Sequence, residues 1–432
     1  MGGILIAAPT SGAGKTTLTL GLLRALHDRG IPVRPAKAGP DYIDPTLHAV
    51  AAERPSVNLD AWAMRPETLR ALAEGNGPLV VEAAMGLFDG AADGSASAAD
   101  LAAELGLNVV LILDCARAGA SVAATLRGFA THRADVRIAA AILNRVASDR
   151  HERIVRRAVE PVCQELGIEL LGTVRRDGGL TLPGRHLGLV PGGEVRELGA
   201  VIQAASTQCG LGVDMDRIAR LAGRGGDGTR AVSTVPPLGQ RIAVANDIAF
   251  AFAYPHLLDG WHRAGATVIP FSPLADEAPA ADADAIFLPG GYPELHAGCI
   301  AAAEAFASGI RRAAEARTII YGECGGYMVL GDALTDGDGA THRMLGLLPV
   351  ETSFARRGLH LGYRTVTTGP HGPRSWCART FRAHEFHHST IRSEGDAAHL
   401  FDASDAEGTP LGSVGRCVGS VSGSFMHLID RC

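Results

Sequence analysis

The stretch TIIYGECGGYMVL, residues 318–330, predicts a buried strand, a sharp turn and a helix in succession. β-Branched and aromatic residues at 318–321 favour the strand, and helix-forming residues at 327–330 follow the glycines. Between them, Gly322-Glu323-Cys324-Gly325-Gly326 has the G-x-nucleophile-x-G pattern. Its flanking glycines permit a strained turn that lifts the central side chain clear of the sheet edge. We therefore predict a strand-turn-helix unit with Cys324 as its nucleophile.

The position of Cys324 at the start of the predicted helix bears on its reactivity. Backbone N–H groups and the positive end of the helix dipole favour a thiolate over a thiol, so we expect Cys324 to be more reactive than a buried cysteine. The alternative is a small apolar residue in a core turn. That alternative suits most of the other seven cysteines, which lie outside such a pattern.

Length and composition indicate a two-domain enzyme. A chain of 432 residues is too long for one core and suits two domains of roughly 200 residues each. A net charge of -6, with 47% hydrophobic and 20% charged residues, argues against a nucleic-acid partner. We find no apolar run long enough for a membrane span and no signal-peptide pattern, so we expect a cytoplasmic protein. Eight cysteines without a CxxC pair argue against a structural zinc site.

The N-terminal region predicts a phosphate-binding loop. A strand at 3–8 leads into PTSGAGKTT, and a helix at 18–29 follows. In such a loop the backbone amides cradle phosphates, a lysine reaches the β and γ oxygens, and a hydroxyl ligates magnesium. The predicted nucleotide-binding residues are Ser11, Gly12, Ala13, Gly14, Lys15, Thr16 and Thr17, with Thr16 also a metal ligand. Pro9 replaces the usual first glycine, and Thr10 stands where partition ATPases carry a second lysine.

Acidic residues follow two further predicted strands. Val33–Lys37 opens onto a loop that contains Asp41 and Tyr42, and the apolar strand 79–82 ends in Glu82. Because parallel sheets bind their ligands beyond the strand ends, Asp41 is predicted to hold a metal or orient a substrate. Glu82 has the form of a Walker B acid and is predicted to ligate magnesium, directly or in the second sphere. Asp89 is expected slightly farther out.

Alternation of strands and helices continues through residue 174 and predicts a doubly wound parallel sheet. Asn144 follows one of these strands, where such folds commonly read the adenine base. Residues 223–239 (GRGGDGTRAVSTVPPLG) have no apolar periodicity and are predicted to be a linker. The predicted domains are therefore 1–222 and 240–432.

The second domain supplies candidate partners for Cys324. Gly290-Gly291 follows a predicted strand, and its loop can aim a backbone N–H at an oxyanion, with the Gly325 N–H as the second donor. His427 is our predicted base. The run RAHEFHH at 382–388 raises the alternative of zinc, but neighbouring strand residues point to opposite faces and no third spaced ligand is evident.

Together these motifs resemble the corrinoid a,c-diamide synthases, a glutamine amidotransferase family. The resemblance rests on IAAPTSGAGKTT, KAGPDYIDPTLH, VEAAMGLFDG, LPGGYPELHAG, GECGGYMVLG, AHEFHHSTI and GSFMHLID, and extends over nearly the whole chain. It implies a dethiobiotin synthetase-like P-loop domain followed by a triad-type (class I) glutamine amidotransferase domain. SDRHE at 148–152 and AFAFAYPHLLDGW at 249–261 look closer to the members that act on cobalt-free hydrogenobyrinic acid than to those that act on cobyrinic acid.

The resemblance also implies a reaction and its participants. ATP, with Mg²⁺, would phosphorylate the a and c acetate carboxylates of the macrocycle, and ammonia released from glutamine at Cys324 would displace phosphate. Asp41, Tyr42 and Asp89 would lie near the corrinoid. Triad enzymes place a glutamate two residues after the histidine, whereas Ile429 stands there in this chain. We therefore expect another group to orient His427, and glutamine hydrolysis to be slower than with a full triad.

Two alternatives stay open at this point. A partition-type, nucleotide-switched ATPase would use the same phosphate loop, but Thr10 and the cysteine elbow argue against it. An amidotransferase for another polycarboxylate, such as a cobyric acid precursor, would carry the same motifs. The oligomeric state is also open, a homodimer included.

Overall fold

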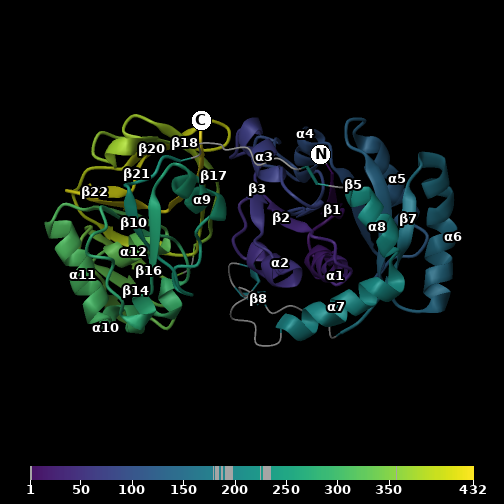
Figure 1. Cartoon of the computed structure of the whole chain (residues 1–432), viewed down its shortest axis with the longest axis horizontal. Coiled ribbons are helices and arrows are strands. Elements are labelled where there is room, and N and C mark those ends of the chain that lie inside the picture. The colour runs from purple at the N-terminus through teal and green to yellow at the C-terminus, as the bar shows by residue number, and fades with distance from the viewer. Residues whose placement is uncertain are drawn as a thin grey trace. The chain divides into compact units, whose positions relative to one another are not determined.

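The structure, a computed structural model, describes residues 2–178, 180, 184–185, 188–189, 198–223, 225–226, 235–356 and 358–432. The chain divides into two compact units (Figure 1). The first contains residues 1–62 and 66–230, and the second contains residues 63–65 and 231–432. The predicted linker lies partly outside the described residues. Within the second unit, the Trp261 indole donates to the Val235 carbonyl and the Trp376 indole to the Pro236 carbonyl.

The first unit is built on a parallel sheet with the strand order β3-β2-β4-β1-β5-β6-β7. The strands are β1 (Gly3–Ala7), β2 (Arg34–Ala38), β3 (Val57–Leu59), β4 (Leu79–Glu82), β5 (Asn108–Asp114), β6 (Ile138–Val146) and β7 (Glu169–Arg175), with a separate pair β8 (Gly184–Arg185) and β9 (Gly188–Leu189). Apolar runs such as LVVE and NVVLILD form these strands because both faces of a parallel sheet are covered.

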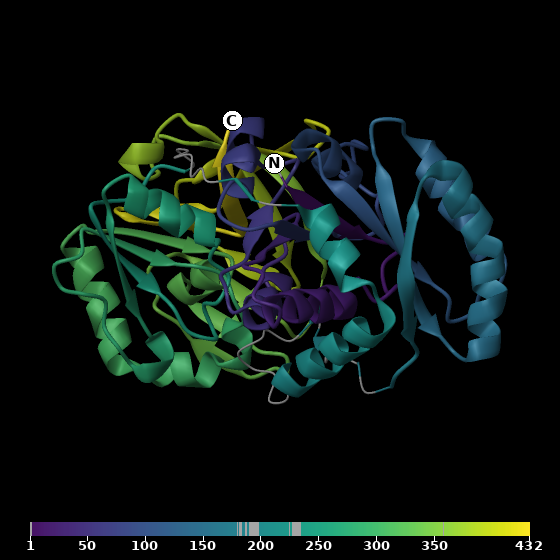
Figure 2. The ribbon, with the colours of Figure 1, turned by 45° about the vertical axis from the view of Figure 1, so that its right-hand side comes forward.

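Helices cover both faces of this sheet, as Figures 1 and 2 show. They are α1 (Lys15–His27), α2 (Asp44–Ala52), α3 (Pro66–Ala73), α4 (Ala98–Leu105), α5 (Val122–His132), α6 (Asp149–Leu166), α7 (Leu198–Gly212) and α8 (Met215–Ala222). Ile4, Ile6 and Val110 pack into one core with α1, α7 and α8. The predicted doubly wound α/β fold is confirmed for this unit. Among the described helices, none combines the length and the apolar composition that crossing a bilayer requires.

The second unit contains a sheet with the order β11-β10-β12-β13-β23-β22, parallel except at β22. Its strands are β10 (Arg241–Ala245), β11 (Thr267–Phe271), β12 (Ala285–Leu288), β13 (Ile319–Glu323), β22 (Arg416–Val418) and β23 (Val421–Ser424). The helices of the unit are α9 (Pro255–Arg263), α10 (Ala297–Ala302), α11 (Glu304–Glu315) and α12 (Gly325–Leu330).

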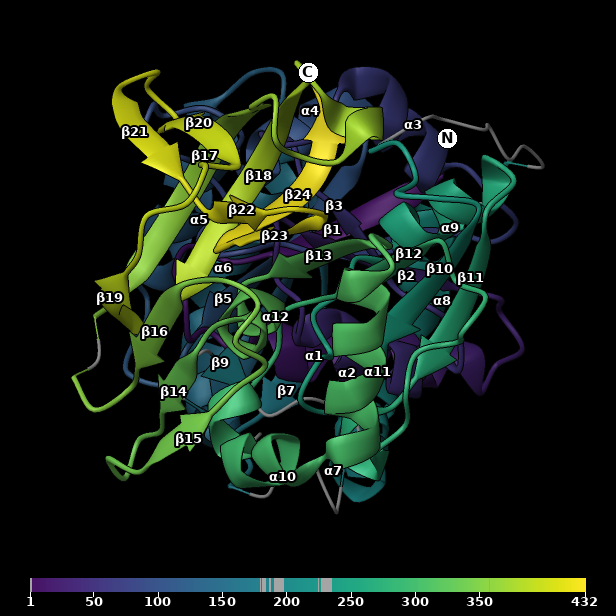
Figure 3. The ribbon, with the colours of Figure 1, turned by 90° about the vertical axis from the view of Figure 1, so that its left-hand side faces the viewer.

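Two antiparallel or mixed sheets complete the second unit (Figure 3). One has the order β15-β14-β16-β19 and the other β21-β20-β17-β18-β24. The strands are β14 (Ala333–Thr335), β15 (Thr341–Arg343), β16 (Val350–Ser353), β17 (His360–Thr368), β18 (Thr380–His387), β19 (Thr390–Glu394), β20 (Phe401–Ser404), β21 (Pro410–Val414) and β24 (Met426–Arg431). β24 directly follows β23, which pairs with β13, so the end of the chain returns to the strand that precedes Cys324.

Candidate active sites of the two units

Cys324 occupies a strained turn between β13 and α12. Its backbone has φ 45° and ψ -99°, a conformation that side chains other than glycine rarely adopt. The Cys324 N–H donates to the Ser424 carbonyl at 2.8 Å, and the Gly326 N–H donates to the Pro289 carbonyl at 3.1 Å. A Cβ on Gly326 would lie 1.9 Å from the Leu288 carbonyl oxygen, so the close packing of the turn requires glycine there. The turn has the backbone of a nucleophile elbow.

Gly290 marks the point where Cys324 and His427 come together. A Cβ built on Gly290 would lie 2.4 Å from His427 Cε1, 3.3 Å from His427 Nε2 and 3.4 Å from the Cys324 Cβ. The imidazole and the cysteine therefore both pack against Gly290, which leaves no room for a side chain at that position. These three residues come from the β12–η3 loop, the elbow and β24, with η3 at Pro293–Leu295.

The backbone amides at positions 291 and 325 also lie close together. A Cβ on Gly325 would be 3.0 Å from the Gly291 nitrogen and 2.9 Å from Pro293 Cδ. A Cβ on Gly291 would be 2.1 Å from the Ala249 carbonyl oxygen, so this loop also needs glycine. The arrangement places the Gly291 nitrogen close to Gly325, the residue that follows Cys324.

The expected thiolate character of Cys324 is wrong for the resting state. Burial raises the pKa of the Cys324 thiol well above its usual range, and the charge of Glu294 adds to the increase. The Gly325 N–H lowers this pKa, but by less. Helix α12 has only six residues, so its dipole does not compensate for the loss of water. Cys324 consequently needs a base to become a nucleophile.

Glu323 lies beside His427, although the sequence pattern gave no role to this residue. Glu323 Oε2 is 3.6 Å from His427 Nδ1, and the two side chains are 3% and 1% exposed. The other oxygen, Oε1, accepts hydrogen bonds from the Tyr321 hydroxyl and the Leu428 N–H, both at 3.1 Å. These bonds hold the carboxylate beside Nδ1, so the opposite edge of the imidazole, with Nε2, stays available. Glu323 lies within the motif, between Gly322 and Cys324. Its proximity to His427 could not be predicted, because it arises only when β23 pairs with β13 and thereby brings β24 alongside.

His384 is the residue on β18 that lies opposite His427 on β24. Burial, together with the neighbouring His427, lowers the pKa of His384 to about 3. His384 is therefore neutral at physiological pH. It neighbours His427 across the pairing of β18 with β24.

In the first unit, the loop between β1 and α1 surrounds the Lys15 side chain. Gly14 has φ 90°, and the Lys15 ammonium donates to the Thr10 carbonyl at 3.2 Å. Burial lowers the pKa of Lys15, and the charge of Lys37 acts in the same direction. Thr17 makes a long contact of 3.5 Å between its hydroxyl and the Leu180 carbonyl. Ser11, Gly12 and Ala13 form the turn that precedes α1.

Glu82, at the end of β4, is the centre of a buried polar network. Its Oε1 accepts hydrogen bonds from the Thr16 hydroxyl at 2.6 Å and the Lys37 ammonium at 2.9 Å. Its Oε2 lies 2.7 Å from His48 Nε2, and Lys37 also pairs with Asp44. Burial raises the pKa of Glu82, but the Lys37 charge and the His48 hydrogen bond outweigh it and keep the pKa below its usual range. The sequence motifs gave no role to Lys37 or His48, although a lysine at the end of the predicted strand Val33–Lys37 was a usable signal.

Asp41 and Tyr42 lie in the loop after β2. The Asp41 carboxylate accepts hydrogen bonds from the Ile43 N–H at 2.7 Å and the Asp44 N–H at 3.1 Å. It therefore fixes the start of α2, and its Oδ1 is engaged by the backbone. Tyr42 is half-buried beside it.

Asp89 lies in the loop after β4. Its Oδ2 accepts a hydrogen bond from the Gly86 N–H at 2.8 Å. Its charge raises the pKa of Lys15, against the larger effect of burial, so the carboxylate is close enough to the phosphate loop to act on that lysine.

Asn144 links the end of β6 to the phosphate loop. Its amide donates to the Ala13 carbonyl at 2.9 Å and accepts from the Arg145 N–H at 2.9 Å. Beside it lies a hollow of about 560 Å³ whose lining includes Asp114, Arg117, Arg145, Arg176 and Asp177. The structure thus gives Asn144 a loop-fixing role, with charged side chains around the adjoining cavity.

Comparisons with known proteins agree for both units. Residues 4–190 match the family described as CobQ/CobB/MinD/ParA nucleotide binding domain, and residues 241–431 match the CobB/CobQ-like glutamine amidotransferase domain. Over the full length, the chain is 54% identical to a hydrogenobyrinate a,c-diamide synthase of Sinorhizobium sp, covering 100% of this chain and 99% of the relative. It is 50% identical to the protein of the same name from Rhodobacter capsulatus, covering 99% and 98%.

Proposed function

Because the chain belongs to the hydrogenobyrinate a,c-diamide synthases, we propose that its two units divide one amidation reaction between them. The chain is an ATP-dependent carbon-nitrogen ligase that takes its nitrogen from glutamine. The second unit releases ammonia from glutamine. The first unit activates the a and c acetate carboxylates of hydrogenobyrinic acid, and ammonia then displaces phosphate. An acyl phosphate is a suitable activated form, since direct condensation of a carboxylate with ammonia in water is unfavourable.

In the second unit, Cys324 attacks the side-chain amide of glutamine. The observation that carries this assignment is the packing of both the His427 imidazole and Cys324 against Gly290. His427 takes the thiol proton and returns it to the departing ammonia. The N–H groups of Gly291 and Gly325 stabilise the tetrahedral oxyanion.

Two buried glutamates serve the same half-reaction. Glu323 orients the His427 imidazole from its Nδ1 edge, which is the role that the missing glutamate two residues after the histidine has in triad enzymes. Glu294 is 7% exposed, and its charge acts on Cys324. A carboxylate in that position suits the α-ammonium group of the glutamine substrate.

In the first unit, Lys15 and Lys37 surround the position where phosphate is transferred. The Lys37 ammonium lies close enough to Lys15 to disfavour its charge, and an incoming anion would offset that repulsion. Lys15 contacts the ATP phosphates. Lys37, which pairs with both Glu82 and Asp44, is positioned to contact the substrate carboxylate or its acyl phosphate. Tyr42 and Asp89 border this region and contact the corrinoid side chains in our proposal, while Asp41 shapes the loop.

Mg²⁺ is the metal that we propose for ATP. Thr16 and Glu82 fit it, because a hydroxyl 2.6 Å from a carboxylate oxygen offers the hard oxygen ligands that Mg²⁺ prefers. The ion supplies charge neutralisation at the phosphates when bound. EDTA is expected to abolish amide formation, and excess Mg²⁺ should restore it.

The adenine base is proposed to occupy the hollow beside Asn144.

We place the reaction in the cytoplasm, where eight cysteines without a disulfide stay reduced. No nucleic acid takes part in it, and a homodimer is the assembly we propose to test by light scattering.

The decisive experiment for the function incubates the protein with ATP, Mg²⁺ and glutamine and with hydrogenobyrinic, cobyrinic or cobyric acid, and identifies the products by mass spectrometry. A diamide formed only from another polycarboxylate would contradict the proposed substrate.

A further inference from the structure

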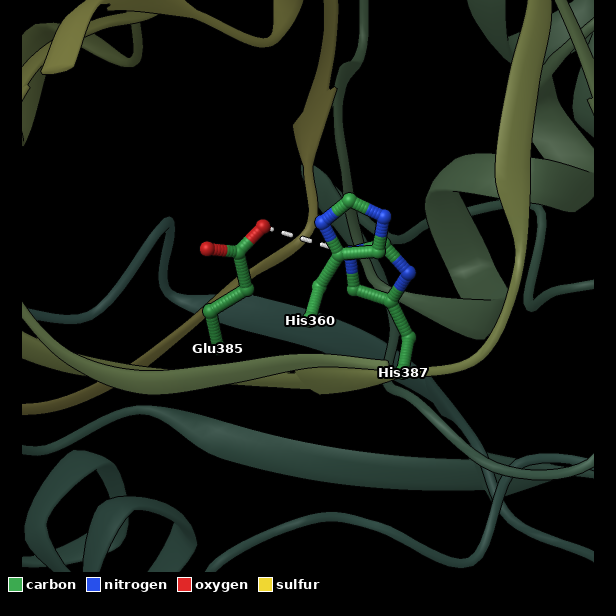
Figure 4. Close-up of side chains that lie close together, drawn as sticks. All are labelled: His360, Glu385 and His387. Carbon is green, nitrogen blue, oxygen red and sulfur yellow. Dashed lines mark hydrogen bonds and ion pairs between the residues drawn. The ribbon is translucent and has the colours of Figure 1, made fainter. Parts of the chain in front are cut away.

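Three potential metal ligands share one face of the antiparallel sheet in the second unit. Glu385 and His387 are two residues apart on β18, so their side chains point to the same side. His360, at the start of β17, lies opposite His387 in the register of the two strands. One ligand atom from each of the three side chains lies within 4.8 Å of the others, as the close-up in Figure 4 shows.

These three ligands differ from the ones that the run RAHEFHH suggests by itself. Strand alternation does turn His384 away from Glu385, and His384 lies opposite His427 on β24. The third ligand that RAHEFHH lacks comes instead from β17, far away in the sequence but adjacent in the sheet. Sequence spacing could not predict this ligand, because only the pairing of β17 with β18 brings His360 beside His387.

Neighbouring groups orient His387 and Glu385 as ligands. His387 Nδ1 lies 3.1 Å from the Ser389 carbonyl oxygen and 3.0 Å from the Ser389 hydroxyl, so Ser389 holds the Nδ1 edge of the ring. Nε2 faces Glu385 Oε1 at 3.2 Å. Without a metal, an N–H on Nε2 donates to this carboxylate oxygen, and a bound cation would take the place of that proton. Arg364 holds the other carboxylate oxygen, with Nε at 2.9 Å and Nη2 at 2.8 Å. Metal sites commonly fix their histidine and carboxylate ligands in this way.

His360 can complete the site by a small movement. Its ring stacks on that of His387, with centroids 4.6 Å apart and planes at 11° (Figure 4). Metal–nitrogen bonds of about 2.0–2.1 Å bring tetrahedral ligands to about 3.4 Å from one another, so the three atoms must approach by about 1 Å. His360 is exposed, and its ring can turn toward Glu385 without repacking the core.

We propose that His360, Glu385 and His387 bind one divalent ion of the zinc class. Two imidazole nitrogens and one carboxylate oxygen suit zinc, cobalt or nickel, whereas Mg²⁺ prefers oxygen ligands alone. Three protein ligands leave a coordination position for water. The ion would join β17 to β18 on the face opposite His384, and it is distinct from the Mg²⁺ of the phosphate loop.

Co²⁺ and Zn²⁺ titrations of the chelator-treated, full-length protein test this site. We expect one ion per chain, a Co²⁺ spectrum without a thiolate charge-transfer band, and a thermal midpoint that rises with ion concentration. His360→Ala should bind at least tenfold more weakly, and it removes an exposed side chain, so the variant should fold. Glu385→Gln, which keeps the side-chain volume, should have the same effect. His371→Ala removes an exposed histidine elsewhere in the unit and should bind like the unmodified protein.

The proposal is overturned by three results. One is the absence of stoichiometric binding, and the second is unchanged affinity in both the His360 and the Glu385 variants. The third is a thiolate band, which would assign the ion to exposed cysteines such as Cys299 or Cys377.

Discussion

At the residue scale, Glu323 is the group that we propose to orient His427, from which it lies 3.6 Å away. Glu323→Gln keeps the volume and the contact with the Leu428 N–H but removes the charge. We expect kcat for glutamine hydrolysis to fall by at least about tenfold with little change in KM, because the substrate does not touch this side chain. Glu315→Gln, on the exposed side of α11, is the control. Unchanged kcat in the Glu323 variant would leave His427 to be oriented by another group.

His427 and His384 can be separated by their effects on the same reaction. His427→Asn should reduce glutamate release by a factor on the order of 100 or more, the usual scale for losing a general acid-base group. Synthesis from ammonium salts should persist. His384→Asn and His387→Asn should have far smaller effects on hydrolysis, since it is the His427 imidazole that packs against Gly290 beside Cys324. Collapse of glutamate release in the His384 variant, with near-normal release in the His427 variant, would move the base to β18.

The elbow shows what a motif can and cannot predict about a residue. Glycines at 322 and 326 indicated the turn because close backbone packing tolerates no side chain there. The reactivity of Cys324 was predicted from a local feature, the helix start, whereas its pKa depends mainly on burial by the rest of the unit. Burial is a property of the tertiary structure, so the local argument gave the wrong direction.

At the scale of elements, apolar strands were predicted well and alternating ones were not. β4 (Leu79–Glu82) has the predicted bounds, because buried parallel strands form continuous apolar runs. β3 (Val57–Leu59) and most strands between 333 and 421 were missed. Most of these strands are short, so they have too few positions for an alternation of polar and apolar residues to distinguish them from loops. His360 was missed for the same reason.

The pairing of β18 with β24 has a consequence for stability. Unfolding exposes His384, whose ordinary pKa is about 6.5, whereas the folded value is about 3. Below pH 6.5 the unfolded chain binds a proton that the folded chain does not, so stability is lost as pH falls from 6.5 toward 3. By pH 5 this loss amounts to about 2 kcal/mol.

Urea unfolding followed by tryptophan fluorescence measures this loss. His384→Asn removes the titrating group, so the difference in unfolding free energy between the original protein and the variant should shrink by about 2 kcal/mol from pH 7 to pH 5. Trp261 and Trp376 are buried in the second unit and report its unfolding. A difference that stays constant with pH would show that His384 is not held neutral by the fold.

At the scale of the whole molecule, the phosphate loop and the elbow belong to different units, so each half-reaction should be separately removable. Lys15→Ala removes the ammonium group that we propose for the ATP phosphates. We expect it to abolish amide formation from both glutamine and ammonium salts while glutamate release persists. Arg29→Ala, on the exposed surface after α1, is a matched control. Full amide formation by the Lys15 variant would contradict the proposed site of ATP use.

The reciprocal variant tests the division of labour from the other side. Cys324→Ala removes the nucleophile, so no glutamate should be released and glutamine should no longer support synthesis. Ammonium salts bypass this step, because they provide the product of the second unit directly to the activated carboxylate. Diamide formation from ammonium salts should therefore continue, whereas Cys299→Ala, an exposed thiol, should retain both routes. Loss of the ammonia-dependent reaction in the folded Cys324 variant would show that the elbow is needed for amide formation itself. The two half-reactions would then not belong to two independent sites.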